Sequence, residues 1–283
     1  VDTGASVIFT DIDDTLNMSP MSLESLITKK TKAIIPVHML GVPADMISIN
    51  KIGKRFKIPI IEDACEAIGA KVAKKYVGGL SEFGVFSFDF GKMITTGEGG
   101  ALFSKKKNDG KIARMYHDHG HKNIPDLPRG LDRAGLIGFN YRMTEISGAF
   151  GKVQLGKFSS ILKESKKRYL TLERYISHNQ IKLRHVNLGN EPNYDTFVIS
   201  IENKKLRDRV ISLLNQTGFG TKNLPDAFNW HCAYFWKHIN KKIRNKEVTN
   251  CYKRLLRCVA IPILVSKPII DYKNIASYIN ELS

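Results

Sequence analysis

The sequence predicts an α/β fold, in which a mostly parallel sheet is covered by helices and followed by a smaller α+β domain. Strand-like and helix-like patterns alternate over the first hundred residues, which is typical of parallel sheets with helical crossovers. Two apolar segments with the pattern of strands run up to residues that can take part in a reaction, Asp63 and Lys92. The length of 283 residues allows one or two domains with a large buried core.

The elements of the first domain follow from apolar spacing and from turn residues. Ser19 and Pro20 suit the N-cap and first position of a helix. The glycine-rich residues 97–100 let the chain reverse between two apolar runs. Strands are expected at residues 7–11, 33–38, 58–63, 83–90 and 101–103. Helices are expected at residues 20–27, 44–56 and 108–117.

A long helical pattern at residues 144–178 separates this domain from the rest of the chain. Its apolar stripe includes Leu155, Phe158, Ile161, Leu162, Tyr169 and Leu172. A strand is expected at residues 196–201, and helices at 206–214 and 269–282. We therefore expect three parts: a large domain at residues 1–150, a connecting helix at 151–178 and a small domain at 179–283.

Lys92 stands just past a buried strand, where partial desolvation favours a neutral, nucleophilic amine. Asp63 ends the preceding strand, and the carboxyl ends of adjacent parallel strands meet at one edge of a sheet. Pyridoxal phosphate needs this pair, because a lysine holds its aldehyde and an aspartate keeps its ring nitrogen protonated. The large domain is therefore expected to bind this cofactor.

Several segments resemble the DegT/DnrJ/EryC1/StrS family of sugar aminotransferases. They are residues 62–70 (EDACEAIGA), 86–88 (FSF), 92–100 (KMITTGEGG) and 140–143 (NYRM). The resemblance covers nearly the whole chain. It implies a PLP-transferase of fold type I that moves an amino group from an amino acid, with glutamate as the expected donor, to a keto-sugar. The sugar is expected to be nucleotide-linked and to serve the biosynthesis of cell-surface polysaccharide, such as lipopolysaccharide.

The resemblance also implies roles for particular residues. Lys92 matches the Schiff-base lysine, Asp63 the acid that faces the pyridine nitrogen, and Ser87 a residue that binds the phosphate. Asn140 matches an asparagine that reaches the phosphate bound by a second subunit, so a homodimer with shared active sites is expected. The family carries an N-terminal region before the position of Val1 that completes the phosphate site, so a truncated chain is expected.

Two residues depart from the family pattern. Glu66 stands where the family usually has Gln or His near the ring hydroxyl, so it is either protonated or makes a different contact. Asp89 stands where the family often has His, Tyr or Asn after the Ser-Phe pair. This residue suggests that the substrate is a different sugar from that of other family members. His119, in the family's His-Gly segment, and Tyr141 are further candidates for substrate contacts.

Three alternatives to the main prediction stay open at this stage. Asp89 raises the possibility of an acidic eight-carbon sugar of the Kdo type. A sugar dehydratase of the same family would use the same cofactor, but such relatives usually carry histidine in place of the lysine, and Lys92 argues against it. A non-catalytic binding or regulatory protein of the same fold is the third.

Other motifs are weaker. Asp11, Asp13 and Thr15 fit the DxDxT motif of a phosphatase, but no further acidic pair follows downstream. Residues 117–121 (HDHGH) resemble a metal cluster, yet the histidines could converge only in an extended segment. Gly91 and Lys92 lack the remaining positions of a P-loop. We expect no metal site.

Composition supports a cytoplasmic protein. Residues 1–150 hold 20 Lys and Arg against 17 Asp and Glu, whereas residues 151–283 hold 24 against 10. We interpret this excess as solvated helix faces, because no basic run is interleaved with aromatic residues as in binders of single-stranded nucleic acid.

No apolar run reaches the length of about 20 residues of a membrane helix, and no signal-peptide pattern is present. The four cysteines show no disulfide spacing. Neither nucleic acid nor a membrane is an expected partner.

Overall fold

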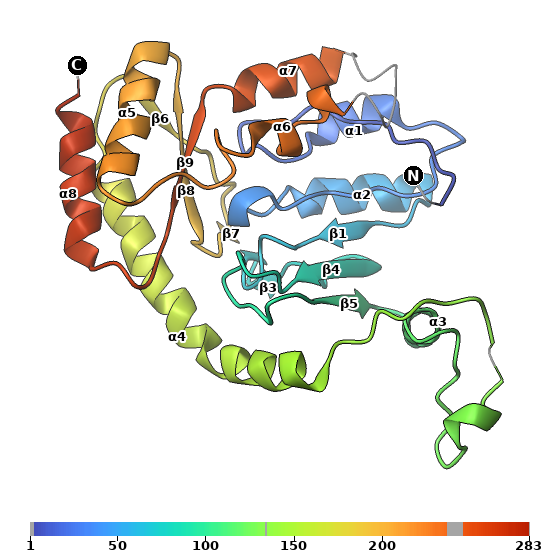
Figure 1. Cartoon of the computed structure of the whole chain (residues 1–283). Coiled ribbons are helices and arrows are strands. Elements are labelled where there is room, and N and C mark those ends of the chain that lie inside the picture. Colours follow the sequence, from blue (N-terminus) through green and yellow to red (C-terminus); the bar gives the residue numbers. More distant parts are fainter. Residues whose placement is uncertain (1–2, 134, 237–245, 283) are drawn as a thin grey trace.

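The computed structural model describes residues 3–133, 135–236 and 246–282. The chain forms a larger N-terminal unit and a smaller C-terminal unit, and one long helix, α4 (Glu145–Tyr175), reaches from the first to the second (Figure 1). The α/β fold expected from the sequence is confirmed. The expected small domain has its own antiparallel sheet.

The sheet of the larger unit positions the chemistry-bearing residues. It consists of β1 (Ile61–Asp63), β4 (Phe83–Ser87) and β5 (Gly100–Ser104), in the order β1-β4-β5. β1 and β4 are parallel with Asp63 opposite Val85, and β4 and β5 are antiparallel because the chain reverses through the glycine-rich turn. Residues 33–38 form no regular strand, but Ile34 and Val37 make isolated parallel bridges to Ile60 and Asp63, so this segment lies beside β1.

Two helices of the larger unit, α1 and α2, begin where short polar side chains cap them. α1 (Pro20–Leu26) starts after Ser19, and α2 (Met46–Phe56) starts after Asp45, whose carboxylate accepts a hydrogen bond from the Ser48 amide. Their apolar faces pack on the sheet through Leu23, Met46, Ile49, Ile52, Ile34 and Ile60. The remaining elements are η1 (Met39–Gly41), β2 (Lys71–Val72), β3 (Lys75–Tyr76), α3 (Lys107–Tyr116) and η2 (Arg129–Leu131).

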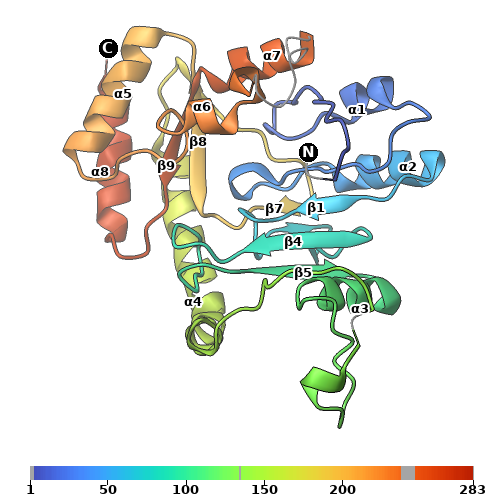
Figure 2. The same ribbon diagram turned by 45° about the vertical axis from the view of Figure 1, so that its right-hand side comes forward.

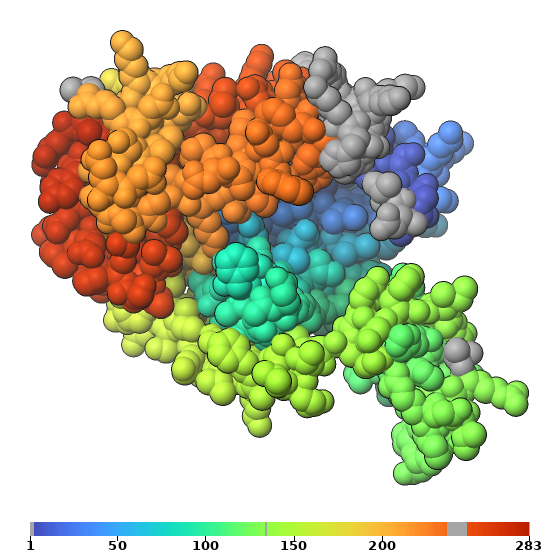
Figure 3. Space-filling model, viewed as in Figure 1, coloured from blue at the N-terminus to red at the C-terminus, as the bar shows by residue number. Residues whose placement is uncertain are grey.

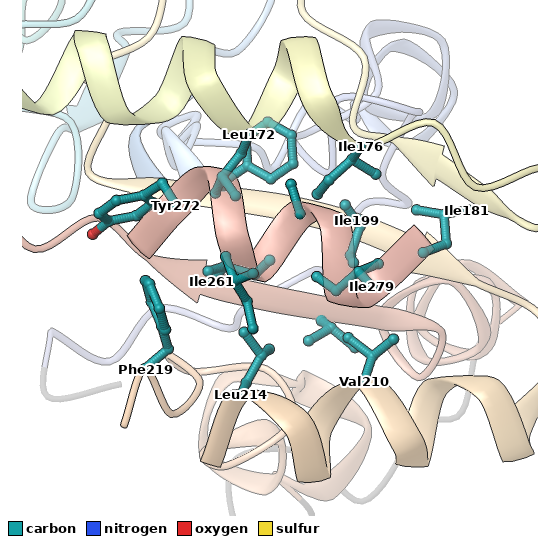
Figure 4. Packing of buried hydrophobic residues seen from close by; sticks show 14 of the residues in the cluster. Leu172, Ile176, Ile181, Ile199, Val210, Leu214, Phe219, Ile261, Tyr272 and Ile279 are labelled. Carbon is teal, nitrogen blue, oxygen red and sulfur yellow. The ribbon is translucent and has the colours of Figure 1, made fainter. Parts of the chain in front are cut away.

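The smaller unit packs helices against an antiparallel sheet. Its strands are β6 (Ile181–Leu183), β8 (Thr196–Ile201) and β9 (Cys258–Pro262), with β8 in the centre. Its helices are α5 (Lys204–Gln216), α6 (Phe228–His231), η3 (Ala233–Phe235), α7 (Lys246–Leu255) and α8 (Ile269–Asn280). Leu172 of α4, Ile199 of β8 and Tyr272 of α8 meet in one buried core, so α4 is anchored in this unit (Figure 4). β7 (Asn190–Glu191) returns to the larger unit and pairs with β2.

The strand expected at residues 7–11 is absent, and the observed strand β9 was not expected. Residues 7–11 form no strand, and within the described chain the neighbouring residue Ile12 bridges only to Met18. Apolar content was misleading there, because Ile8 is exposed rather than packed on the sheet. The sequence also did not predict β9, whose five residues are all buried and therefore lack the alternation of a half-exposed strand.

A buried carboxylate, that of Glu62 on β1, binds one backbone turn, residues 78–81, and the side chain of His38. It accepts hydrogen bonds at 2.7 Å from the amides of Gly78, Leu80 and Ser81. His38 Nε2 lies 3.3 Å from the same carboxylate, and because His38 Nδ1 accepts the Ala44 amide, Nε2 carries the ring proton. Burial opposes ionisation, but the hydrogen bonds from His38 and the backbone outweigh it and lower the pKa of Glu62.

We predict that Glu62→Gln destabilises the fold by about 2–4 kcal/mol at pH 7, because the new amide group would face the amide of Gly78 or the ring N–H of His38. The loss should shrink below about pH 4.3, where the carboxyl of the unfolded chain takes up a proton and the stabilisation by the ionised form fades. Urea unfolding at several pH values measures it. A difference independent of pH would contradict an ionised Glu62.

Gly84 of β4 allows a close approach of the 78–81 turn, since a Cβ atom there would lie 1.9 Å from the Gly78 carbonyl oxygen. We predict that Gly84→Ala lowers the free energy of unfolding by about 2 kcal/mol or more. Gly156→Ala is the matched control, because a Cβ atom on this exposed position of α4 meets no atom within 4 Å. The control should stabilise the helix by up to about 1 kcal/mol. Equal effects of the two changes on urea unfolding would contradict the packing argument.

Candidate active site

Three charged side chains gather around Cys65, directly after β1. Asp63 Oδ1 accepts a hydrogen bond from the Cys65 amide at 3.1 Å, and Lys92 Nζ lies 3.7 Å from Glu66 Oε1. Burial and the Asp63 carboxylate raise the pKa of the Cys65 thiol to about 12, while the Lys92 charge acts in the opposite sense. Asp63, Glu66 and Lys92 thus share one electrostatic environment, as expected from the parallel pairing of β1 and β4.

Lys92 is held by a compact loop that follows β4. Phe88 begins the loop: its amide donates to the Gly99 carbonyl, and its own carbonyl accepts the Thr96 amide, both at 2.9 Å. Within this closed loop the Lys92 amide donates to the Asp89 carbonyl at 3.1 Å. The positive φ of +81° at Gly97 explains the glycine needed for the reversal.

Asp89 has a local role in this loop. Its Oδ1 accepts the Gly91 amide at 3.0 Å, and its amide donates to Ser87 Oγ at 3.3 Å. The side chain that suggested a different sugar is therefore engaged in shaping the turn before Lys92.

Glu66 is ionised and tightly held. Its Oε2 accepts the Leu40 amide at 2.9 Å, and its Oε1 accepts from Asn223 Nδ2 at 2.8 Å. Burial opposes ionisation, but the Leu40 amide, the Lys92 and Lys222 charges and Asn223 together lower the pKa of this carboxyl. Of the two possibilities left by the sequence, the structure favours a charged Glu66 with contacts of its own.

The donors and acceptors at this site fit pyridoxal phosphate. Lys92 supplies a primary amine, only partly exposed, for the aldehyde. Asp63 is a carboxylate acceptor whose contacts are with Cys65, through its amide and its thiol. The Ser87 hydroxyl accepts the Asp89 amide, and within the described part of the chain it donates no hydrogen bond, so its proton is available to a ligand. An acceptor for a ring N–H, a donor for a phosphate and an amine are the three groups that the cofactor requires.

Asn140, Tyr141 and His119 lie away from Lys92. They belong to a lobe formed by α3 and residues 117–141, which projects from the larger unit in both views (Figures 1 and 2). All three are exposed, and Asn140 bridges to Asp118 within the lobe. A single chain does not bring these predicted site residues together with the lysine.

The acidic and histidine-rich motifs have structural partners in the lobe and near the N-terminus. Hydrogen bonds from Arg129 lead in holding the pKa of Asp118 far below its usual range, and Arg142 binds the same carboxylate. Asp13 Oδ1 accepts the Thr15 amide at 2.8 Å, and Asn250 Nδ2 donates to Asp11 Oδ2 at 3.1 Å. No three metal-binding side chains converge within residues 3–133, 135–236 and 246–282.

Sequence reasoning missed the residues that reach Glu66 from elsewhere. Asn193 Nδ2 donates to the Glu66 carbonyl at 2.9 Å, and Lys222 and Asn223 approach from the smaller unit. An asparagine in a turn carries no local signal of such a contact. Only the folding of residues 193 and 223 against residue 66 reveals it.

Comparison with known proteins agrees with this geometry. The sequence model of the DegT/DnrJ/EryC1/StrS aminotransferase family matches residues 1–276. Similar solved structures include 3-amino-5-hydroxybenzoic acid synthase, with 25% identity and a TM-score of 0.82 over 98% of this chain and 74% of that chain. PseC of Helicobacter pylori, an aminotransferase involved in the biosynthesis of pseudoaminic acid, has 23% identity and a TM-score of 0.85 over 98% and 74%.

An E. coli GDP-4-keto-6-deoxy-D-mannose-3-dehydratase with bound hydrated PLP is also similar, with 24% identity and a TM-score of 0.81 over 98% of this chain and 75% of that chain. At these identities the last two structures show a common fold. The chain spans about three quarters of the length of each of these proteins. None of the helices described here is long and apolar enough to cross a membrane.

We predict that Cys65 in the cofactor-free protein reacts with iodoacetamide at pH 8 roughly a hundredfold more slowly than a free cysteine, because its thiolate is disfavoured. Asp63→Asn should accelerate the reaction by removing the neighbouring carboxylate, whereas Asp45→Asn should not. Peptide mass spectrometry resolves Cys65 from the other cysteines. Equal rates in wild type and Asp63→Asn would show that Asp63 does not face the thiol.

Proposed function

Because the chain belongs to the DegT/DnrJ/EryC1/StrS aminotransferase family, we propose that it transfers the amino group of an amino acid, with glutamate as donor, to a nucleotide-linked keto-sugar. The family is dependent on pyridoxal phosphate, and the chain is an enzyme of the sugar aminotransferase type. The product would enter cell-surface polysaccharide, including lipopolysaccharide. The four unpaired cysteines support a cytoplasmic location.

The observation that carries this proposal is the amine of Lys92 beside Glu66 and downstream of Asp63, at the ends of two parallel strands. The dehydratases of the family usually have histidine at the lysine position, so Lys92 favours amino transfer. Asp89 gives no support to an acidic eight-carbon sugar, because its carboxylate accepts the Gly91 amide within the lysine loop.

The residues divide the work as follows. When bound, pyridoxal phosphate supplies an aldehyde for the amine and a ring that delocalises the electrons of a breaking bond. Lys92 Nζ would hold the aldehyde and, once displaced by the donor amine, carry a proton to and from carbon. Asp63 would keep the ring nitrogen protonated, Ser87 would donate to the phosphate, and Glu66 would lie near the ring hydroxyl.

We propose that two copies of the chain complete each other's sites. The lobe stands away from the body (Figure 3), and Asn140 on it would reach the phosphate held by a second copy. Tyr141 and His119 would then contact the sugar. Large apolar side chains exposed near the lobe and the start of α4 support an interface there; they include Phe90, Ile137, Ile146, Val153 and Leu155.

A groove beside the lysine loop supports the same surface. Its volume is about 250 Å³, and it is lined by residues of the loop, such as Phe88 and Ile94, and of α4, such as Gly151 and Leu155. A side chain of the second copy would fill it. Within each copy we propose the division expected from the sequence, with a cofactor-binding domain at residues 1–150, a connecting helix at 151–178 and a small domain at 179–283.

We predict that the purified chain with pyridoxal phosphate develops a visible absorption band that borohydride bleaches, leaving a stable adduct at position 92. Lys92→Ala should lose the band entirely, whereas Lys106→Ala, which removes an exposed lysine at the start of α3, should keep it. The absorption spectrum and peptide mass spectrometry measure this. A wild-type chain without the band, or a band that survives in Lys92→Ala, would contradict the proposal.

A further inference from the structure

Two asparagines of the smaller unit, Asn193 and Asn223, donate hydrogen bonds to Glu66. Asn223 Nδ2 donates to its carboxylate at 2.8 Å, and Asn193 Nδ2 donates to its backbone carbonyl at 2.9 Å. We refer to Asn193 and Asn223 as the asparagine clamp. Both the main chain and the side chain of Glu66 are therefore oriented by residues more than a hundred positions away in the sequence.

Further contacts hold the two asparagines of the clamp in place. Asn193 Oδ1 accepts the Asp195 amide at 3.1 Å, and the Asp195 carboxylate forms an ion pair with Lys222, the residue before Asn223. This pair ties the two asparagine-bearing turns to each other. The Lys222 amide also donates to the Ala260 carbonyl on β9 at 2.9 Å.

Close backbone approaches leave the clamp little freedom. The Asn193 amide donates to the Gly41 carbonyl at 3.0 Å, and a Cβ atom on Gly41 would lie 1.9 Å from Asn193 Oδ1. Asn223 has a φ of +65°, a left-handed conformation that asparagine and glycine tolerate best. The clamp is therefore a defined geometry rather than a chance surface contact.

Glu66 in turn lies between the clamp and the lysine. Its Oε1 accepts from Asn223 and lies 3.7 Å from Lys92 Nζ, while Oε2 is bound by the Leu40 amide. The charges of Lys222 and the buried Arg184 also act on this carboxylate, and Asp63 and Glu66 both act on the Cys65 thiol. Asn223 of the smaller unit is thus connected to Lys92 through the Glu66 carboxylate.

We propose that the asparagine clamp positions the Glu66 carboxylate against Lys92, so that Asn193 and Asn223 control how readily the lysine amine reacts with an aldehyde. Asn193 and Asn223 are positioning residues that act through Glu66. The proposal rests on the proposed function of Lys92 as the cofactor lysine. It adds residues that the sequence did not predict.

The clamp makes a directional prediction about the cofactor-free protein. The Glu66 carboxylate forms an ion pair with Lys92 at 3.7 Å, so loss of the carboxylate should free the amine to react. In Glu66→Gln, labelling of Lys92 by pyridoxal phosphate at pH 7 should rise roughly threefold to tenfold. Asn223→Gly keeps the backbone conformation but frees the carboxylate, so its profile should shift in the same direction by a smaller amount.

The experiment traps the labelled lysine with borohydride across a pH series and quantifies the adduct at position 92 by peptide mass spectrometry. Asn123→Gly is the matched control, because Asn123 also has a left-handed φ, +51°, but lies in the lobe. Its profile should match that of the wild type. In the Glu66→Gln background, Asn223→Gly should cause no further shift, since its effect passes through the carboxylate.

The outcomes separate the two proposals. If Lys92 is not labelled in the wild type at any pH, the proposed function fails and the clamp's role fails with it. If Lys92 is labelled but Asn223→Gly follows the wild-type profile, only the clamp proposal is overturned. A lower melting temperature with an unchanged profile would likewise make Asn223 merely structural.

Discussion

The carboxylate of Glu62 holds the larger unit in the arrangement on which the site depends. Three backbone amides of the 78–81 turn and the ring of His38 converge on it in the protein interior. An ionised group at full burial is tolerated only when its hydrogen bonds are satisfied, and here they are. Since successive side chains of a strand point to opposite faces, anchoring Glu62 on one face of β1 turns Asp63 to the other.

The hydrogen-bonded Glu62 also influences the position of Lys92, through the packing of the 78–81 turn. The 78–81 turn that binds Glu62 also presses against Gly84 of β4, and β4 leads into the loop that carries the lysine. Parallel pairing of β1 with β4 then brings the ends of both strands together. Asp63 on β1 and Lys92 beyond β4 are therefore positioned by the hydrogen bonds of Glu62, which contact neither residue.

Glu66 connects this rigid part to the rest of the molecule. It takes a hydrogen bond from the Leu40 amide of the larger unit and another from Asn223 of the smaller unit. The long helix α4 carries the chain from the projecting lobe to the core of the smaller unit (Figure 1). The carboxylate beside Lys92 therefore has hydrogen-bond partners in both units.

The sequence by itself determined the α/β fold, the strand that ends at Asp63, the strand before the Lys92 loop and the glycine turn that reverses the chain, because these depend on local patterns. The strand expected at 83–90 ends at Ser87, five residues before Lys92. It also indicated the family through contiguous motifs. It did not reveal the strand β9, whose residues are buried on both faces, or the absence of a strand at residues 7–11. Both depend on what packs against the segment.

Only the tertiary structure decided the charge and contacts of Glu66, because they depend on Leu40, Asn193, Lys222 and Asn223, which are distant along the chain. The contact of Asp89 is local by contrast, because its carboxylate accepts the amide of Gly91, two residues further on. Hydrogen bonds between segments far apart in sequence leave no periodicity and no spacing to detect. Their positions follow from the folded arrangement of the two units.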